Sequence, residues 1–302
     1  MQNFLTLVLI LLPMFVGFFV PNTPSLTKKS EQGLNYLVFI ILIVIGIELG
    51  FVENISQKVG DILIYLGCLL ILTIGFGSLG LYIFEKVIGY PYPKNHHANT
   101  SSSHHLLSGL IQPMCILVGF VMAKSFPMLY LPQHIITALL MALLFLVGIC
   151  LNGSGISLKQ ALFNRYGVKL SLVFMGATLM GGAMFSLMFK EVSLWQGLAL
   201  ASGFGWYSLS GTVMTEAYGV IWGSVALFND LGRELLALVF IPHVMRYRPA
   251  VAIGLGGVTS LDFTLPVLTQ SGGIQITPLV VSFGFITNVV SPILMVVFSA
   301  IG

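Results

Sequence analysis

Long apolar stretches separated by short polar connections fill most of this chain. A helix that crosses ~30 Å of hydrocarbon needs about 17 to 25 residues. Stretches of this length fall at 4–20, 35–52, 61–85, 107–123, 134–151 and 168–189, and again at 219–245 and 276–300. The pattern predicts eight helices that cross a lipid bilayer.

Two further apolar segments, 194–215 and 250–270, contain residues that break helices. The first carries glycine and serine at 201–205, and the second carries glycine, serine, threonine and proline at 256–266. Non-helical backbone at membrane depth is tolerated only where it is buried in protein or lines a water-filled cavity. We therefore expect two interrupted or re-entrant segments in an all-α polytopic membrane protein, with eight to ten transmembrane segments in total.

The composition excludes a soluble protein. Of 302 residues, 57% are hydrophobic and only 8% are charged, so polar side chains cannot cover a water-exposed surface. No nucleic-acid partner is expected. Segment 4–20 lacks a basic start and a small-residue cleavage site, which favours a retained span over a signal peptide. Cys68, Cys115 and Cys150 lie apart in apolar runs and indicate no disulfide, metal site or cofactor.

The distribution of lysine and arginine predicts the topology, because these residues accumulate in short cytoplasmic loops. With the N-terminus outside and both interrupted segments re-entrant, nine lie inside and three outside. If both segments cross fully, the bias falls to seven against five. The counts favour both termini outside, with ten discontinuous crossings as the alternative. The nine are Lys28, Lys29, Lys86, Lys94, Lys159, Arg165, Lys169, Arg246 and Arg248; the three are Lys58, Lys124 and Lys190.

An internal repeat divides the single domain 1–302. The tripeptide at 16–18 recurs at 118–120, and 46–49 resembles 148–151 at the same offset of 102 residues. Each copy holds three spans, an odd number, so the second copy would enter the membrane from the opposite face, as in inverted-repeat transporters. Chance similarity between apolar segments is the alternative. The predicted parts are a first repeat at 1–88, a linker at 89–105, a second repeat at 106–190 and a substrate-site region at 191–302.

The linker contains four histidines, His96, His97, His104 and His105, within a polar run. Such residues can bind a metal ion, but no carboxylate accompanies them. A flexible polar connector between the repeats is the favoured interpretation.

Charged residues inside apolar segments mark the candidate site. Glu234 and Asp262 each lie near interrupted backbone, and helical spacing places Asp230 and Glu234 on one face, with Arg233 beside them. A charge at the bilayer centre costs at least about 2.5 kcal/mol, so these residues should face a cavity or a partner. We predict a solute path here. Contacts between helices, including a self-satisfied Asp230–Arg233 pair that positions its helix, are the structural alternative.

The cluster carries a formal charge of −2 and suits a cation. A basic amino acid fits the cluster better than a simple cation does. Glu234 and Asp262 can bind its ammonium groups, while Arg233 or a half-helix N-terminus binds its carboxylate.

Other residues could support this site. Asn229, Ser208 and Ser260 are polar neighbours in sequence, and Trp206 and Tyr207 could contact the solute's aliphatic part or its ammonium group. Core packing is the equal alternative for the two aromatic residues. Glu48 lies near a predicted span end, where it is either part of an exit vestibule or simply hydrated.

The segments at 201–211, 228–235 and 259–268 resemble the bacterial lysine exporter LysO family, and 145–149 and 158–160 also fit. The resemblance covers nearly the whole chain and is strongest from about residue 140. It implies an inner-membrane exporter of L-lysine and its analogue thialysine, with both termini outside and paired intramembrane acids that correspond to Glu234 and Asp262. Glu48 is not among the residues that the resemblance assigns.

Proton antiport is the expected mechanism. Moving one positive charge outward against an inside-negative potential costs about 2.3 kcal/mol per 100 mV. Exchange of one proton for one lysine cation removes that cost, with Glu234 and Asp262 as coupling residues. The first alternative is export or exchange of ornithine, arginine or an inorganic cation. A cation channel is the second and less favoured alternative. The paired motifs of an intramembrane protease are absent from the sequence, so no enzyme is predicted. The oligomeric state is not predicted.

Overall fold

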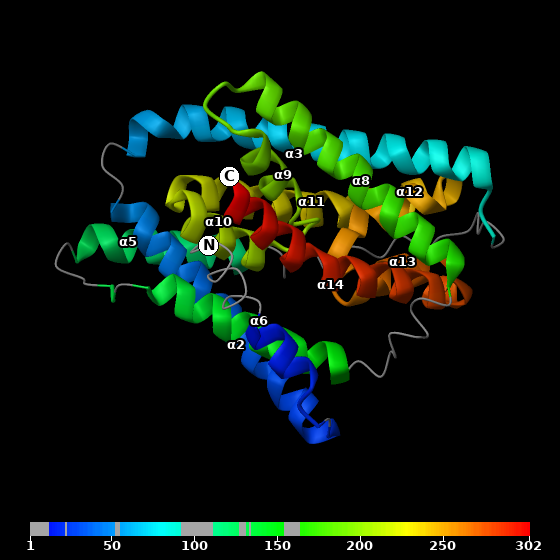
Figure 1. The fold of residues 1–302 in the computed structure, drawn as a ribbon, viewed down its shortest axis with the longest axis horizontal. Helices are drawn as coiled ribbons and strands as arrows, with labels where there is room; N and C mark the ends of the chain where they lie inside the picture. The colour runs from blue at the N-terminus through cyan, green and yellow to red at the C-terminus, as the bar shows by residue number, and fades with distance from the viewer. Residues whose placement is uncertain are drawn as a thin grey trace.

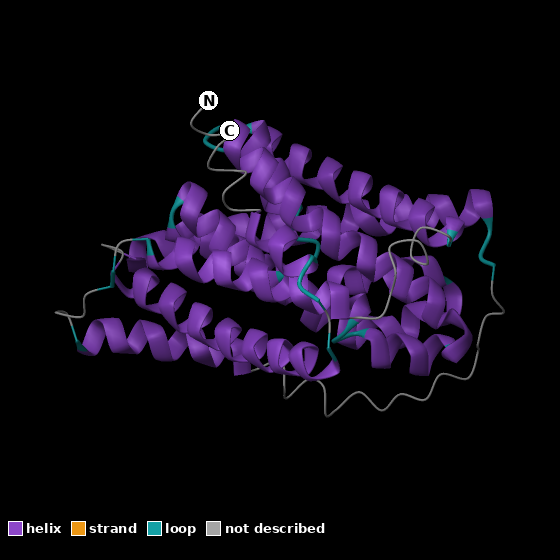
Figure 2. Cartoon of the chain, turned by 60° about the horizontal axis from the view of Figure 1, so that its bottom comes forward, coloured by secondary structure: helices purple, strands orange, loops and turns teal. Residues whose placement is uncertain are grey.

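The computed structural model describes residues 12–21, 23–51, 55–91, 111–126, 131–132, 134–153 and 164–302. Helices joined by short turns account for almost all of these residues, and no strand occurs among them (Figure 2). The fold is therefore all-α, as predicted. The histidine-rich run 96–105 and the start of segment 4–20 lie outside the described residues.

The long helices coincide with predicted spans. They are α2 Pro24–Phe51, α3 Ile55–Ile88, α5 Ile111–Ser125, α6 Ile135–Gly153, α8 Arg165–Met188, α11 Val220–Tyr247 and α14 Thr277–Ile301. Four of them, α2, α3, α8 and α14, contain windows long and apolar enough to cross a membrane. Helix α11 has 28 residues, about 42 Å at the usual helical rise, but its charged side chains lower its hydropathy.

Some helix ends were predicted wrongly. Helix α2 begins at Pro24 rather than at residue 35, and α3 begins at Ile55 rather than at residue 61. Proline suits the first turn of a helix because its missing N–H has no partner there. Polar residues in these first turns hid the helices from a search for apolar windows.

The segment predicted at 194–215 is a helical hairpin, called here the first hairpin. Helix α9 Leu194–Ala201 is capped by the Ser193 side chain, and α10 Tyr207–Tyr218 follows after a break. A Cβ placed on Gly302, at the end of α14, would lie 2.9 Å from the Tyr218 hydroxyl and 3.3 Å from that of Ser193. The hairpin therefore enters and leaves the bundle at the same end.

The segment predicted at 250–270 also folds back on itself and forms the second hairpin. It consists of α12 Pro249–Gly256, the 3₁₀ turn η1 Gly257–Leu261 and α13 Leu265–Gly272. Its first arm contacts the last turn of α3, where Glu85 accepts a hydrogen bond from the backbone N–H of Ala250. Its second arm returns to Met245 near the end of α11. The two hairpins enter from opposite ends of the bundle (Figure 1).

The tips of the hairpins meet in the middle of the bundle. The backbone N–H of Val258 donates to the carbonyl of Phe204 over 3.0 Å. Helix α14 holds both tips, because Asn288 donates to the Val258 carbonyl and Ser291 donates to the Ser202 carbonyl. The broken helices thus satisfy backbone groups that an uninterrupted helix would pair internally.

The remaining helices form two groups (Figure 1). Helices α3 and α8 lie side by side and cover the hairpins, α11 and α14, whereas α2 packs against α5 and α6. The second group reaches the first through contacts of α2 with α10 and α11 and of α6 with α10.

Four glycines allow close helix contacts in the group that contains α2. Each faces a backbone carbonyl of the neighbouring helix at a distance that leaves no room for a Cβ atom. Small residues at such crossings are typical of membrane helices. The contacts form two pairs. In each pair, adding 102 to the glycine's number and subtracting 102 from its partner's number turns the first contact into the second. The contacts are Gly17 with Phe145 and Gly119 with Ile43, and Gly46 with Ile116 and Gly148 with Met14.

Candidate functional site

The charged stretch of α11 lies at the level of the two hairpin tips. Asn229, Asp230, Arg233 and Glu234 are all buried, with no more than 2% of each residue exposed. Burial of this much charge requires specific partners. Some polar atoms of these side chains have hydrogen-bond partners in the structure, and others have none.

Asp230 holds the tip of the first hairpin. Its Oδ1 atom accepts hydrogen bonds of 3.1 Å from the Gly205 backbone N–H and from the Asn229 side chain. Gly205 has a φ of 100°, a conformation that favours glycine. A Cβ on Gly203 would collide with the Asp230 carboxylate. The helix is interrupted here, and the Asp230 carboxylate accepts the Gly205 backbone N–H that a continuous helix would pair with a carbonyl.

Arg233 connects α11 to three other elements. Its Nη2 donates to the Thr73 carbonyl of α3 over 3.2 Å, and its guanidinium carbon lies 5.2 Å from the centre of the Phe174 ring. Its Nη1 lies near Gly257, in the second hairpin, and has no hydrogen-bond partner. Asp230 thus accepts hydrogen bonds from the first hairpin and from Asn229, and Arg233 donates one to α3, while the two charged groups also attract each other electrostatically.

Glu234 and Asp262 differ sharply in exposure. Glu234 is 2% exposed, and its Oε1 has no hydrogen-bond partner. Asp262 lies between η1 and α13 in the second hairpin, is exposed, and accepts a hydrogen bond from the Phe263 backbone N–H. The two carboxylates are close enough to interact electrostatically. One buried and one accessible carboxylate therefore meet beside the broken backbone.

The supporting residues divide between the two hairpins. Ser260 donates to the Ile253 carbonyl within the second hairpin, and buried Ser208 lies in the first turn of α10. Trp206 is half-buried and packs against the buried hydrophobic core, which fits the core-packing alternative, and Tyr207 is also half-buried. Glu48 is half-buried in α2, and its carboxylate interacts electrostatically with that of Glu216 in the last turn of α10.

Sequence reasoning missed several residues that build this centre. Glu85 follows an apolar run and precedes Lys86, so it resembled an ordinary interfacial acid; it is 5% exposed. Thr73 and Ser291 carried no signal. Asn288 could have been noticed, because an amide in the apolar stretch 276–300 requires a partner.

Glu85 should matter for the second hairpin. Its carboxylate lies at the N-terminus of α12, where a negative charge is favourable. We expect Glu85→Ala to lower the free energy of unfolding by about 1 to 3 kcal/mol, because the Ala250 N–H loses its charged acceptor. Glu85→Gln, which keeps an acceptor, should lose less. Thermal unfolding of the purified protein in detergent measures both; equal losses would contradict the capping role.

An all-helical polytopic membrane protein, with two re-entrant hairpins that meet beside buried charges, belongs architecturally with membrane transporters. The sequence pattern described as "Lysine exporter LysO" matches residues 113–299. The chain belongs to this lysine exporter family.

Two relatives have names that fit the family. "Lysine exporter LysO" of Escherichia coli is 37% identical over 301 residues, which cover 97% of this chain and 99% of that protein. A "Putative lysine exporter" of Haemophilus influenzae is 46% identical over 172 residues, 57% of this chain and 88% of that protein. The first match extends through the N-terminal third, where the resemblance was weakest. No solved structure matches the chain.

Proposed function

We propose that this protein exports L-lysine from the cytoplasm in exchange for protons, with Glu234 and Asp262 as the binding and coupling residues. The observation that carries the proposal is the buried Glu234 carboxylate, whose Oε1 has no hydrogen-bond partner. Such an atom is costly to bury unless a ligand or proton completes it. The names of the relatives support lysine as the ligand.

The free groups of the site match the charged groups of lysine. Lysine has two ammonium groups and one carboxylate. Glu234 offers a free acceptor and Asp262 an accessible carboxylate, while Arg233 offers a free N–H donor at Nη1. Asp230 is engaged with the first hairpin and is assigned a positioning role. Thialysine has the same charged groups, so the same site would accept it.

Coupling follows from competition for Glu234. A buried carboxylate without a partner is strongly destabilising, so an empty and ionised site is a poor state for changing conformation. Either a proton or an ammonium group removes the penalty. A carrier that changes conformation only in these two states exchanges one ion for the other, with no net charge moved.

The topology completes the proposal. If both hairpins are re-entrant and the N-terminus is outside, nine basic residues lie inside and three outside. This bias supports a bacterial inner-membrane protein with both termini outside. The exchange of glycine contacts by the 102-residue shift supports inverted repeats at 1–88 and 106–190, with 89–105 as linker and 191–302 as substrate-site region. Inverted repeats suit alternating access because each can adopt the other's conformation.

Counterflow in proteoliposomes tests the transported solute. Vesicles loaded with unlabelled L-lysine should accumulate labelled L-lysine with saturable kinetics, and protein-free vesicles should not. Unlabelled ornithine, arginine and sodium, added in turn, show whether another cation competes equally well. Absence of saturable lysine movement by the folded protein would contradict the proposal, and non-saturable flux would indicate a channel.

A further inference from the structure

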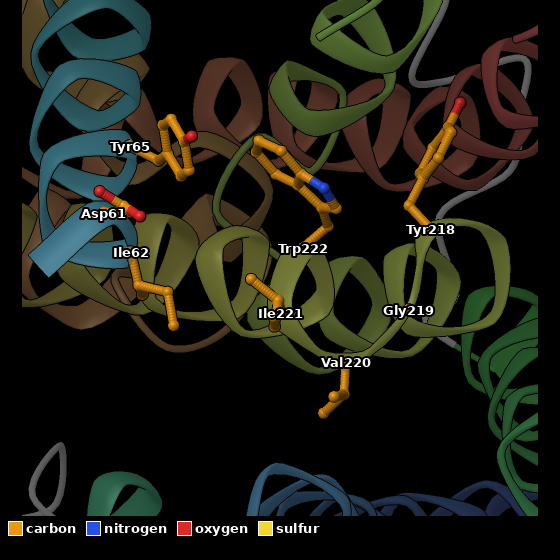
Figure 3. A pocket seen from close by; sticks show the side chains of 8 residues that line it. All are labelled: Asp61, Ile62, Tyr65, Tyr218, Gly219, Val220, Ile221 and Trp222. Atoms are coloured by element: carbon orange, nitrogen blue, oxygen red, sulfur yellow. The ribbon is translucent and has the colours of Figure 1, made fainter. Parts of the chain in front are cut away.

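A cavity of about 410 Å³ lies at the end of the bundle where the first hairpin enters (Figure 3). One wall comes from the first turns of α3, with Asp61, Ile62 and Tyr65. The other comes from the turn between α10 and α11, residues 218–222. The cavity is thus bounded by the last residue of the first hairpin and by the start of the helix that carries Glu234.

Aromatic side chains form a fixed wall of this cavity. Tyr65 stacks on Trp222, with ring centres 5.0 Å apart and planes at 29°. Tyr65 also makes a T-shaped contact with Phe189, with ring centres 4.9 Å apart. Its hydroxyl donates a 2.5 Å hydrogen bond to Glu191, and this bond lowers the pKa of the Glu191 carboxyl. Packing and hydrogen bonding on several sides hold the Tyr65 ring in one orientation.

Asp61 adds a negative charge to the aromatic wall. It precedes Tyr65 by one helical turn, which places both on the same face of α3, and Figure 3 shows their side chains together. Asp61 is exposed, so its carboxylate is free to meet a solute. A carboxylate beside electron-rich ring faces is the arrangement that recognises alkylammonium ions.

The cavity is separate from the central site. Trp222 and Glu234 are twelve residues apart on one helix, which corresponds to about 18 Å along the axis. An extended lysine molecule is too short to contact both. The first hairpin and α11 connect the two places physically.

We propose that this cavity is a second, outer binding site for the primary ammonium group of the transported solute, formed by Asp61, Tyr65 and Trp222. The identity of the solute and the outward direction rest on the proposed function; the recognition of an alkylammonium ion does not. Lysine leaving the central site is held here before release, and lysine outside the cell binds here first when the carrier runs in reverse.

Substitutions in the cavity should change the apparent affinity for lysine on one membrane face only. Counterflow is measured with oriented vesicles and lysine varied on either face. Asp61→Asn and Trp222→Leu should each raise the outer half-saturation concentration by about tenfold, whereas Trp222→Phe, which retains a ring, should change it less. The inner half-saturation concentration should stay within about twofold. Equal changes on both faces, or no change on either, overturn the proposal.

A matched control and a transport-independent measurement complete the test. Trp195→Leu removes an aromatic residue at the same end that stacks on Phe298 outside the cavity, and should leave both affinities unchanged. Butylammonium chloride should give a saturable change of tryptophan fluorescence in the intact protein. This change should persist in Glu234→Gln and vanish in Asp61→Asn; loss in Glu234→Gln instead would place the binding in the central site. If lysine transport is absent but this pattern remains, only the proposed function fails.

Discussion

Replacing Glu234 by glutamine should reduce proton-coupled lysine exchange at least about a hundredfold. The substitution keeps the shape of the side chain but removes the charge that an ammonium group or proton would neutralise. Removing one partner of a buried charge pair costs about 3 to 5 kcal/mol, and 1.4 kcal/mol corresponds to tenfold in a binding constant. Initial rates of labelled lysine counterflow, at equal amounts of protein in the vesicles, measure the loss.

Two comparisons make the Glu234 result specific. Glu216→Gln changes an exposed acid of α10 and should leave the rate unchanged. Asp262→Asn should also lower the rate, because Asp262 is the second carboxylate proposed to bind the ammonium groups of lysine. A Glu234→Gln protein that still exchanges lysine for protons at the normal rate would remove Glu234 from the mechanism.

Replacing Gly257 by alanine should destabilise the centre of the protein and stop transport. Gly257 has a φ of 56°, and a Cβ there would overlap the Phe204 carbonyl of the first hairpin. Left-handed backbone costs a non-glycine residue about 1 to 2 kcal/mol, and overpacking adds about 1 to 3 kcal/mol. Thermal unfolding, followed by tryptophan fluorescence, should therefore show a loss of about 2 to 5 kcal/mol in the free energy of unfolding.

Gly176 provides the control for this prediction. It lies on the exposed face of α8, and a Cβ there would have no neighbour within 4 Å. Gly176→Ala should leave transport intact and unfold at the same or a higher temperature, since alanine favours helix. Equal stability of the Gly257 and Gly176 variants would show that the contact between the hairpin tips is not needed.

The sequence was informative about the candidate site where the physical signal is local. Charged residues in apolar segments are expensive, so Asp230, Arg233 and Glu234 stood out without any structure. Helix-breaking residues at 201–205 and 256–266 likewise marked both interruptions. The choice between crossing and re-entrant segments rested on counts of basic residues, and the contacts of Ala250 and Tyr218 favour re-entrance.

What the sequence could not reveal depends on contacts between distant residues. The hydrogen bond from Arg233 to Thr73 joins positions 160 residues apart, and that from Ala250 to Glu85 joins positions 165 apart. Helical spacing suggested instead that Arg233 and Asp230 satisfy each other. Local periodicity favours such neighbours, whereas in the structure Asp230 accepts a hydrogen bond from Gly205 of the first hairpin and Arg233 donates one to Thr73 of α3.

Lysine-driven proton movement tests the central claim most directly. Proteoliposomes containing a pH-sensitive dye receive a lysine gradient and no pH gradient, while potassium gradients with valinomycin set the membrane potential at zero or at a chosen value. We predict that lysine flow drives protons in the opposite direction at a rate that does not depend on the imposed potential, and that Glu234→Gln abolishes the signal. Saturable lysine movement without proton movement, or a rate that follows the membrane potential, would contradict electroneutral exchange at this site.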